Sequence, residues 1–319
     1  MKNIVILGGG TAGWMAANLL QKRWRQKGVN ITVVESPDIG IIGVGEGSTP
    51  LLKEFFDSLD ISESEWMPQC NATYKNGISF NNWSTVSGYE SYFHPFPCSL
   101  DFATFGLLYK YTALRRSGVD VLAHPNRFSL MAGLTQKKLA PLPAENFPFH
   151  FQYGYHFDSV LIGKFLRGKA KESGVSHIEG TVETVEQDSD GNIKALKLKN
   201  GYILSGDFFI DCSGFASILL QRTLKVPFLS FSENLFNDSA VALPTEIEAD
   251  APVETLSTAL TNGWAWKIPL TNRFGNGYVF SSQYCSPDEA ETEPVSYTHL
   301  RAHETRGNIV CRVVLEKKK

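Results

Sequence analysis

Apolar and polar positions at the start of the chain fall in blocks that predict a strand, a helix and a second strand. Residues 4–7 are four consecutive aliphatic residues, which is typical of a buried parallel strand. Residues 14–27 support a helix that Gly28 is expected to end. Residues 31–35 form the second apolar strand, and its last residue is the acid Glu35. This order predicts a β-α-β unit with a parallel sheet.

The next block has a different character. Residues 62–155 are rich in aromatic residues, short strands and loops, which predicts an insert. Within it, residues 74–80 alternate as a strand, and residues 93–96 form a rigid aromatic turn. The alternation separates Lys75 from the residues of the opposite face, which are Tyr74, Ile78 and Phe80.

Regular elements return after residue 155. A helix is predicted at 159–173, with Asp158 or Ser159 as its cap and Gly174 at its end. Turn-forming residues then separate the three short strands of a β-meander, predicted at 182–185, 193–198 and 202–204. Residues 208–211 form a further apolar strand that ends on an acid.

A strand predicted at residues 264–268 carries two tryptophans. Because strand side chains alternate, Trp264 and Trp266 share one face and Lys267 points away. Pro269 ends the strand, since it has no N–H for the ladder. Two indoles on one face would build an apolar wall, although the spacing alone also suits a pair of core tryptophans.

The loop after the first strand has the GxGxxG spacing of a dinucleotide site. Gly8 permits the tight turn, Gly10 lets the backbone approach a pyrophosphate, and Gly13 lets helix and strand pack closely. The phosphates would lie at the helix N-terminus, and Glu35 could hold a ribose hydroxyl. The cofactor-binding residues predicted here are Gly8, Gly10, Thr11, Ala12, Gly13 and Glu35.

Two further segments favour FAD over NAD. Residues 41–50 form a second glycine-rich loop whose backbone could approach a flat ring system, with a mobile surface loop as the alternative. Residues 208–215 repeat the order of apolar strand, acid and glycine turn. No second GxGxxG is present, so reducing equivalents are expected from elsewhere. The further predicted cofactor-binding residues are Gly45, Glu46, Ser48, Asp211 and Gly214.

Composition narrows the class of protein. The 319 residues, 43% hydrophobic and 20% charged, describe an ordinary globular chain. A net charge of −3 gives no reason to expect nucleic acid or an anionic membrane as a partner. There is no apolar run long enough for a membrane span and no room for a signal peptide, so the cytoplasm is the expected compartment. Five scattered cysteines indicate neither a disulfide framework nor a metal site.

Five segments, in this order, resemble the flavin-dependent tryptophan halogenases: 8–14, 74–78, 94–96, 211–215 and the WxWxIP sequence of 264–269. The resemblance spans about residues 1–293 and implies an α/β, FAD-binding two-dinucleotide-fold flavoprotein. This fold has a Rossmann-like parallel sheet, a β-meander and an inserted aromatic-rich substrate region. The FAD-binding module would comprise 1–60 and 155–225, and the substrate and tunnel region 61–154 and 226–293.

The resemblance also implies a chemistry. In that family reduced FAD, supplied by a separate flavin reductase, reacts with O2 to give a flavin hydroperoxide. Chloride or bromide attacks this species, and the hypohalous acid travels through a tunnel to a lysine beside an electron-rich aromatic substrate, with tryptophan or another indole as the leading expectation. Lys75 matches the catalytic lysine, as an ammonium or as a neutral amine. The matching substrate-binding residues are Ile78, His94, Phe96, Trp264 and Trp266.

The sequence departs from the family pattern near its end. The catalytic glutamate and the halide-binding backbone of the family are not recognisable, and residues 294–319 are expected to be a non-native tail. This chain is therefore expected to halogenate little. A flavin-dependent aromatic monooxygenase and a non-catalytic FAD-binding remnant stay open as alternatives, and an NAD-dependent dehydrogenase is the weakest. His156 is interpreted as structural.

Overall fold

A computed structural model describes residues 2–40, 43 and 45–290. The chain divides into two compact units. Unit 1 comprises residues 1–43, 56–70 and 159–230, and unit 2 comprises residues 44–55, 71–158 and 231–319. Helix α2 (Leu51–Ser58) contains the point at which the chain passes from unit 2 into unit 1. None of the described helices is long and apolar enough to cross a bilayer.

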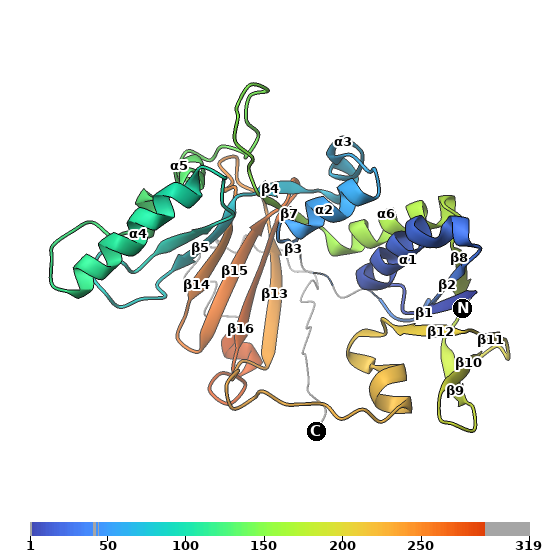
Figure 1. Cartoon of the computed structure of the whole chain (residues 1–319). Coiled ribbons are helices and arrows are strands. Elements are labelled where there is room, and N and C mark those ends of the chain that lie inside the picture. The colour runs from blue at the N-terminus through green and yellow to red at the C-terminus, as the bar shows by residue number, and fades with distance from the viewer. Residues whose placement is uncertain (1, 41–42, 44, 291–319) are drawn as a thin grey trace. The chain divides into compact units, whose positions relative to one another are not determined.

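Unit 1 is built on a parallel sheet of four strands in the order β12-β1-β2-β8 (Figure 1). These strands are β1 (Asn3–Leu7), β2 (Asn30–Glu35), β8 (Ser176–Glu179) and β12 (Phe208–Asp211). Helix α1 (Thr11–Trp24) joins β1 to β2 and packs against α6 (Ser159–Glu172), where Asn18 Nδ2 donates to Leu166 O at 2.9 Å. The short α3 (Glu63–Trp66) belongs to the same unit. This arrangement confirms the predicted α/β class.

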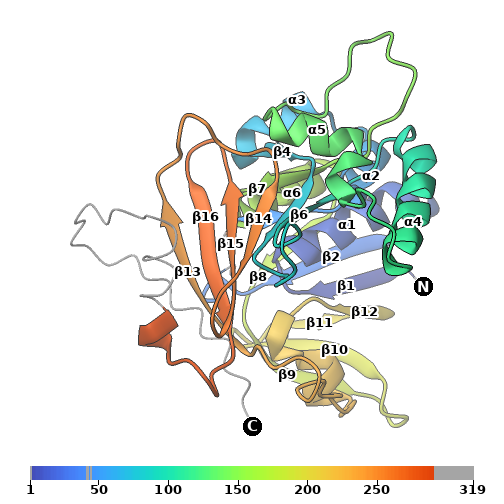
Figure 2. The same cartoon turned by 90° about the vertical axis from the view of Figure 1, so that its left-hand side faces the viewer.

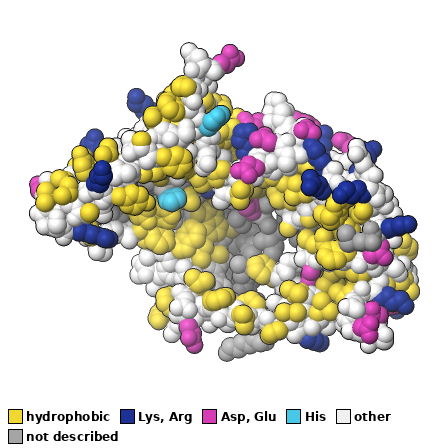
Figure 3. Space-filling view, viewed as in Figure 1, with side chains coloured by type: hydrophobic (Ala, Val, Ile, Leu, Met, Phe, Trp, Pro, Cys, Tyr) yellow, Lys and Arg dark blue, Asp and Glu magenta, His cyan; other side chains and the backbone are white. Residues whose placement is uncertain are grey.

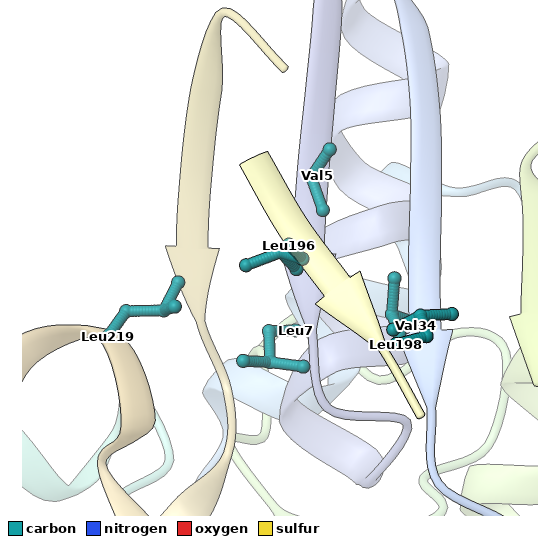
Figure 4. Packing of buried hydrophobic residues seen from close by; sticks show 6 residues of the cluster. All are labelled: Val5, Leu7, Val34, Leu196, Leu198 and Leu219. Carbon is teal, nitrogen blue, oxygen red and sulfur yellow. The ribbon is translucent and has the colours of Figure 1, made fainter. Parts of the chain in front are cut away.

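The predicted meander is present as an antiparallel sheet of three strands, β9 (Val182–Gln187), β10 (Ile193–Leu198) and β11 (Ile203–Ser205). Its inner face is covered by the parallel sheet, because Leu196 and Leu198 pack with Val5 and Val34 (Figure 4). Such aliphatic contacts supply most of the stability of a small α/β unit. A π-helical turn at Ile218–Thr223 closes the cluster with Leu219.

Unit 2 is mainly antiparallel. Its six-stranded sheet has the order β13-β16-β15-β14-β5-β6 (Figure 2), and a second sheet has the order β3-β7-β4. Helices α4 (Asp101–Arg116) and α5 (Leu130–Gln136) also belong to this unit. The strands of the large sheet are β5 (Gly77–Asn81), β6 (Tyr92–Pro95), β13 (Ser239–Thr245), β14 (Thr255–Ala259), β15 (Gly263–Pro269) and β16 (Phe274–Phe280). Those of the small sheet are β3 (Glu46–Gly47), β4 (Thr73–Lys75) and β7 (Gly154–Phe157).

Two local predictions in this unit were wrong. Residues 74–80 do not form one strand, because Asn76 separates β4 from β5 and each belongs to a different sheet. Residues 93–96 are not a turn, because Tyr92–Pro95 forms β6 and pairs with β5. The proline is accommodated because β6 is the edge strand of its sheet.

The unit boundaries differ from the expected domain bounds in four places. Residues 155–158 cluster with unit 2, and residues 226–230 cluster with unit 1. Residues 44–55 cluster with unit 2, since β3 pairs with β7, whereas residues 61–70 cluster with unit 1. The proposed functional assignment of each part stays a prediction. The tail expected at residues 294–319 lies outside the described residues.

The cluster below the meander gives a stability prediction. Leu196 is fully buried, so Leu196→Ala should reduce the free energy of unfolding by about 2–5 kcal/mol. Ile203→Ala, on the neighbouring strand, should cost about 1 kcal/mol or less, because Ile203 is 52% exposed. Urea unfolding followed by circular dichroism measures both. Equal losses for the two variants would contradict the described packing.

Candidate active site

The GxGxxG loop of unit 1 has the tight geometry that its spacing predicts. Gly8 has φ of +117°, and a Cβ at this position would overlap the carbonyl of Cys212. A Cβ on Gly13 would overlap the carbonyl oxygen of Gly8, so this glycine permits α1 to begin directly beside β1. Gly10, in contrast, faces open space. The loop therefore holds its own turn closely and leaves room at Gly10 for a ligand.

The N-terminus of α1 is suited to a phosphate. The first turn, which contains Thr11 and Ala12, has no acidic residue, and the N-cap Gly10 supplies no side-chain cap. Its backbone N–H groups carry the positive end of the helix dipole. Thr11 Oγ1 donates to Ser159 O at 3.3 Å, which ties this turn to α6.

Glu35 ends β2 beside the same loop. Its side chain is so close to Gly9 that a Cβ there would overlap it. His177 Nε2 lies 3.0 Å from Glu35 Oε2, and Arg167 Nη1 lies 3.5 Å from the same oxygen. The carboxylate is thus held in place next to the GxGxxG loop. Its predicted bond to a ribose hydroxyl stays a prediction.

Asp211 organises the turn that follows β12. Its carboxylate accepts hydrogen bonds from Ser213 N and Oγ at 3.1 and 2.5 Å, and from Leu219 N and Leu220 N at 2.9 Å each. Burial raises the pKa of Asp211, but these hydrogen bonds lower it more, so the net shift is downward. The carboxylate therefore shapes the loop around Gly214, which has φ of +61° and faces open space. Direct contacts of Asp211 and Gly214 with a cofactor stay predictions.

The later part of the second glycine-rich segment, residues 45–50, lies in unit 2. Gly45 has φ of +93°, and Glu46 begins β3. Ser48 fastens β3 to β7, because Ser48 N donates to Tyr155 O at 2.8 Å and Ser48 Oγ accepts from Tyr155 N at 2.9 Å. The predicted cofactor residues are therefore divided between the two units.

Lys75 is buried at the end of β4, with a relative exposure of 5%. Burial lowers its pKa from 10.5 to about 8. Its Nζ lies 5.6 Å from the centroid of the Phe96 ring, a cation–π distance. The surface lysine that an isolated strand would suggest is thus excluded. An amine that is buried and easily deprotonated is a candidate catalytic group.

Asn76 explains why Lys75 turns inward. Asn76 N donates to Val253 O at 2.8 Å, and its O accepts from Phe96 N at 2.9 Å. Its side-chain amide donates to Thr135 Oγ1 and Leu139 O, each at 3.0 Å. These bonds hold the chain at the break between β4 and β5 and place Phe96 next to the amine.

The sheet register brings the predicted substrate residues to one face. His94 pairs with Ile78, and Ile78 pairs with Thr255. Side chains two positions away on the same strand have the same orientation. They form a second row across the sheet, which contains Tyr92, Phe80, Ser257 and Trp266. His94 is exposed at the edge, whereas Ile78, Phe96, Trp264 and Trp266 are half-buried.

Aromatic rings form a continuous layer on this face. Tyr92 and Phe80 stack with centroids 5.1 Å apart, and Trp83 lies 5.6 Å from Phe80. Trp83 then approaches Trp264 at 6.5 Å, and Trp264 approaches Trp266 at 6.2 Å. Figure 3 shows apolar side chains gathered over β14 and β15. The two tryptophans of β15 are thus part of a wall and not an isolated core pair.

Three neighbours of Lys75 were not predicted to be part of the site: Gly47, His156 and Thr255. A Cβ on Gly47 would lie 2.8 Å from Lys75 Nζ, 3.0 Å from Thr255 Oγ1 and 3.4 Å from His156 Cδ2. His156 is fully buried, and Asp158, two residues further along the chain, pairs with Arg273 at 3.1 Å. A polar residue within the aromatic run of β7 is the one sequence signal that singles out His156.

The parallel sheet, glycine loop and meander define an α/β protein of the dinucleotide-binding class. The sequence profile described as "Tryptophan halogenase" matches residues 3–314, and the chain belongs to this family. The match passes residue 293, where the resemblance was expected to stop, and this expectation was wrong.

Individual relatives agree with the family assignment. Tryptophan 7-halogenase RebH of Lentzea aerocolonigenes is 38% identical over 318 residues, which cover 93% of this chain and 59% of the relative. Tryptophan 6-halogenase SttH of Streptomyces toxytricini is 38% identical, with 96% and 62% covered. The chain therefore spans about three fifths of the length of these relatives.

Solved structures show the same fold. The crystal structure of SttH from Streptomyces toxytricini has a TM-score of 0.82 and 35% identity, with 98% of this chain and 64% of that chain covered. Xcc4156, a flavin-dependent halogenase from Xanthomonas campestris, has a TM-score of 0.83 and 36% identity, with 98% and 62% covered.

The burial of Lys75 predicts a pH-dependent stability. Below about pH 8 the folded chain buries an ammonium, which costs roughly 3 kcal/mol. Between about pH 8 and 10.5 the folded state releases this proton before the unfolded state does, so the contribution of Lys75 to stability rises with pH. Lys75→Met should therefore be more stable than the parent at pH 7, and this advantage should shrink by roughly 3 kcal/mol toward pH 10.5.

Urea unfolding followed by tryptophan fluorescence at several pH values measures this difference. Lys110→Met serves as the control, because Lys110 is exposed on α4 and should show no such trend. A constant difference between Lys75→Met and the parent would contradict a lowered pKa.

Proposed function

We propose that the chain acts in FADH2-dependent chlorination or bromination of an electron-rich aromatic compound, with tryptophan or another indole as the substrate. The observation that carries the proposal is the buried amine of Lys75, located beside an aromatic sheet face in a tryptophan halogenase family member. The tryptophan halogenases at 38% identity support the substrate class.

FAD fits the loop geometry of unit 1. Open space at Gly10, an acid-free helix N-terminus and the fixed carboxylate of Glu35 suit a pyrophosphate and a ribose. Reduced FAD, together with O2 and a halide, supplies hypohalous acid when it is bound. The reduced cofactor would come from a separate flavin reductase in the cytoplasm, since the sequence holds no second GxGxxG.

Lys75 would receive and orient the hypohalous acid. With a pKa of about 8, its ammonium form predominates at neutral pH, and an ammonium can donate hydrogen bonds to a hypohalous acid and polarise it. Phe96 beside the amine and His94 at the sheet edge would hold the aromatic ring of the substrate. The wall that contains Trp264 and Trp266 would keep water from the oxidant.

The indole N–H of Trp266 is a further sign of a ligand on this face. The nitrogen is buried, and no residue in the described part of the chain accepts a hydrogen bond from it. Leaving such a donor unsatisfied costs about 1–3 kcal/mol, which a small polar ligand would offset.

Gly13→Ala tests the FAD site. The added methyl group would overlap backbone, so strain of about 1–3 kcal/mol should move α1 from its position. FAD affinity, measured by quenching of flavin fluorescence, should then fall about tenfold or more. Gly168→Ala is the control, because its Cβ meets nothing within 4 Å. Unchanged affinity in Gly13→Ala would contradict this site.

Lys75→Met tests the reaction. With FAD, a flavin reductase, O2, bromide and indole, the parent chain should form a brominated product, detected by mass spectrometry because turnover is expected to be low. The Lys75→Met variant should form none while oxygen consumption continues, and Lys110→Met should behave like the parent. A hydroxylated product that forms without bromide would favour the monooxygenase. Bound FAD with no product under any condition would favour the binding remnant.

A further inference from the structure

We infer that His156 is a positioning residue for Lys75, and that it acts through a hydrogen-bond relay of fixed direction that includes Thr255 and Thr73. The catalytic meaning of the relay rests on the proposed function of Lys75. Its geometry comes from the small sheet, where β7 lies between β3 and β4 and His156 pairs with Gly47 on one side and with Thr73 on the other.

The donor and acceptor of each hydrogen bond in the relay can be assigned by starting from the backbone carbonyl of Pro269, which can only accept. Thr73 Oγ1 donates its single hydrogen to Pro269 O at 2.7 Å. The contact of 3.1 Å between Thr73 Oγ1 and His156 Nδ1 must therefore have the histidine as the donor. A neutral imidazole that carries its hydrogen on Nδ1 has a lone pair on Nε2. Thr255 Oγ1, 3.0 Å from Nε2, then donates to it.

The charge state of His156 agrees with this assignment. The side chain is fully buried, and burial together with the charge of Lys75 lowers its pKa well below the ordinary value of 6.5. The imidazole is therefore neutral. Glu254, the acid next to Thr255 in the sequence, bonds Ser79 Oγ at 3.4 Å and so lies toward the opposite face from Ile78.

The consequence for Lys75 concerns the oxygen of Thr255. Because the Thr255 hydrogen is committed to His156, the oxygen presents only lone pairs to the space above Gly47 that it shares with Lys75 Nζ. An ammonium presents only donors. The relay thus favours an amine that directs an N–H toward Thr255, and the ring of Phe96 is its cation–π neighbour.

The far end of the relay is on the tryptophan strand. Pro269 is the last residue of β15, which also carries Trp264 and Trp266. A continuous set of hydrogen bonds therefore runs from Pro269 of β15 through Thr73 and His156 to Thr255, beside Lys75. These bonds hold the tryptophan strand and the surroundings of the amine in a fixed relative position.

Thr255→Val and Thr255→Ser test the inference. Removing the hydroxyl takes a lone-pair oxygen from the space above Gly47 that it shares with the ammonium, so Thr255→Val should weaken proton binding by Lys75 about tenfold and lower its pKa by about one. Thr255→Ser keeps the hydroxyl and should leave the pKa near about 8. The pKa is measured from the pH dependence of stability, with each variant compared with its own Lys75→Met double variant. Equal shifts in both variants, or no shift in either, would overturn the relay.

A second measurement needs no substitution. Nitrogen-15 NMR of the histidine side chains should show His156 as a neutral ring with its hydrogen on Nδ1, unchanged from pH 6 to pH 9. A hydrogen on Nε2, or a titration near the ordinary histidine pKa, would overturn the assigned direction. Both measurements are made without turnover. A failure of halogenation and a failure of the relay are therefore separate results.

Discussion

The arrangement of the second unit is constrained by one buried amine, that of Lys75. A lysine excluded from water favours its neutral form and destabilises the folded chain while it is charged. The chain accepts this cost at Lys75 because Asn76, directly after it, satisfies hydrogen bonds to three separate segments. The break between β4 and β5 is therefore not a weak point in a strand. It is the feature that turns the amine inward and begins the large sheet.

From that break the rest of the face follows by register. Once β5 is fixed at Gly77, its pairing with β6 and β14 determines which side chains share the face with Ile78. A slip of one residue in either pairing would move the side chains of the shifted strand to the other face. The bond from Thr73 to Pro269 connects the small sheet to the last residue of β15. The amine and the tryptophans are thus held by the same set of strands.

The sequence predicted what depends on local pattern. The strands and helix around the glycine loop, the meander and the helix that begins at Ser159 all follow from short-range periodicity and from glycines at element ends. The site around Lys75 depends on distant pairs. Thr73 is 83 residues from His156, and Thr255 is 99 residues from it. No local pattern identifies these partners, and His156 looked structural without them. The edge strand β6, which contains Pro95, was likewise predicted to be a turn.

In the second glycine-rich segment, residues 41–50, different glycines meet different structural constraints. At Gly43 a Cβ would overlap Ser159 Oγ, and at Gly45 the backbone has a left-handed φ of +93°. At Gly47 the space above the Cα is taken by Lys75 Nζ and Thr255 Oγ1. The sequence suggested one shared reason, room for a flat ring system. Each glycine also has a reason of its own within the chain, and room for a flat ring system stays a prediction. That of Gly47 is the most informative, because a side chain there would displace the amine on which the proposed chemistry depends.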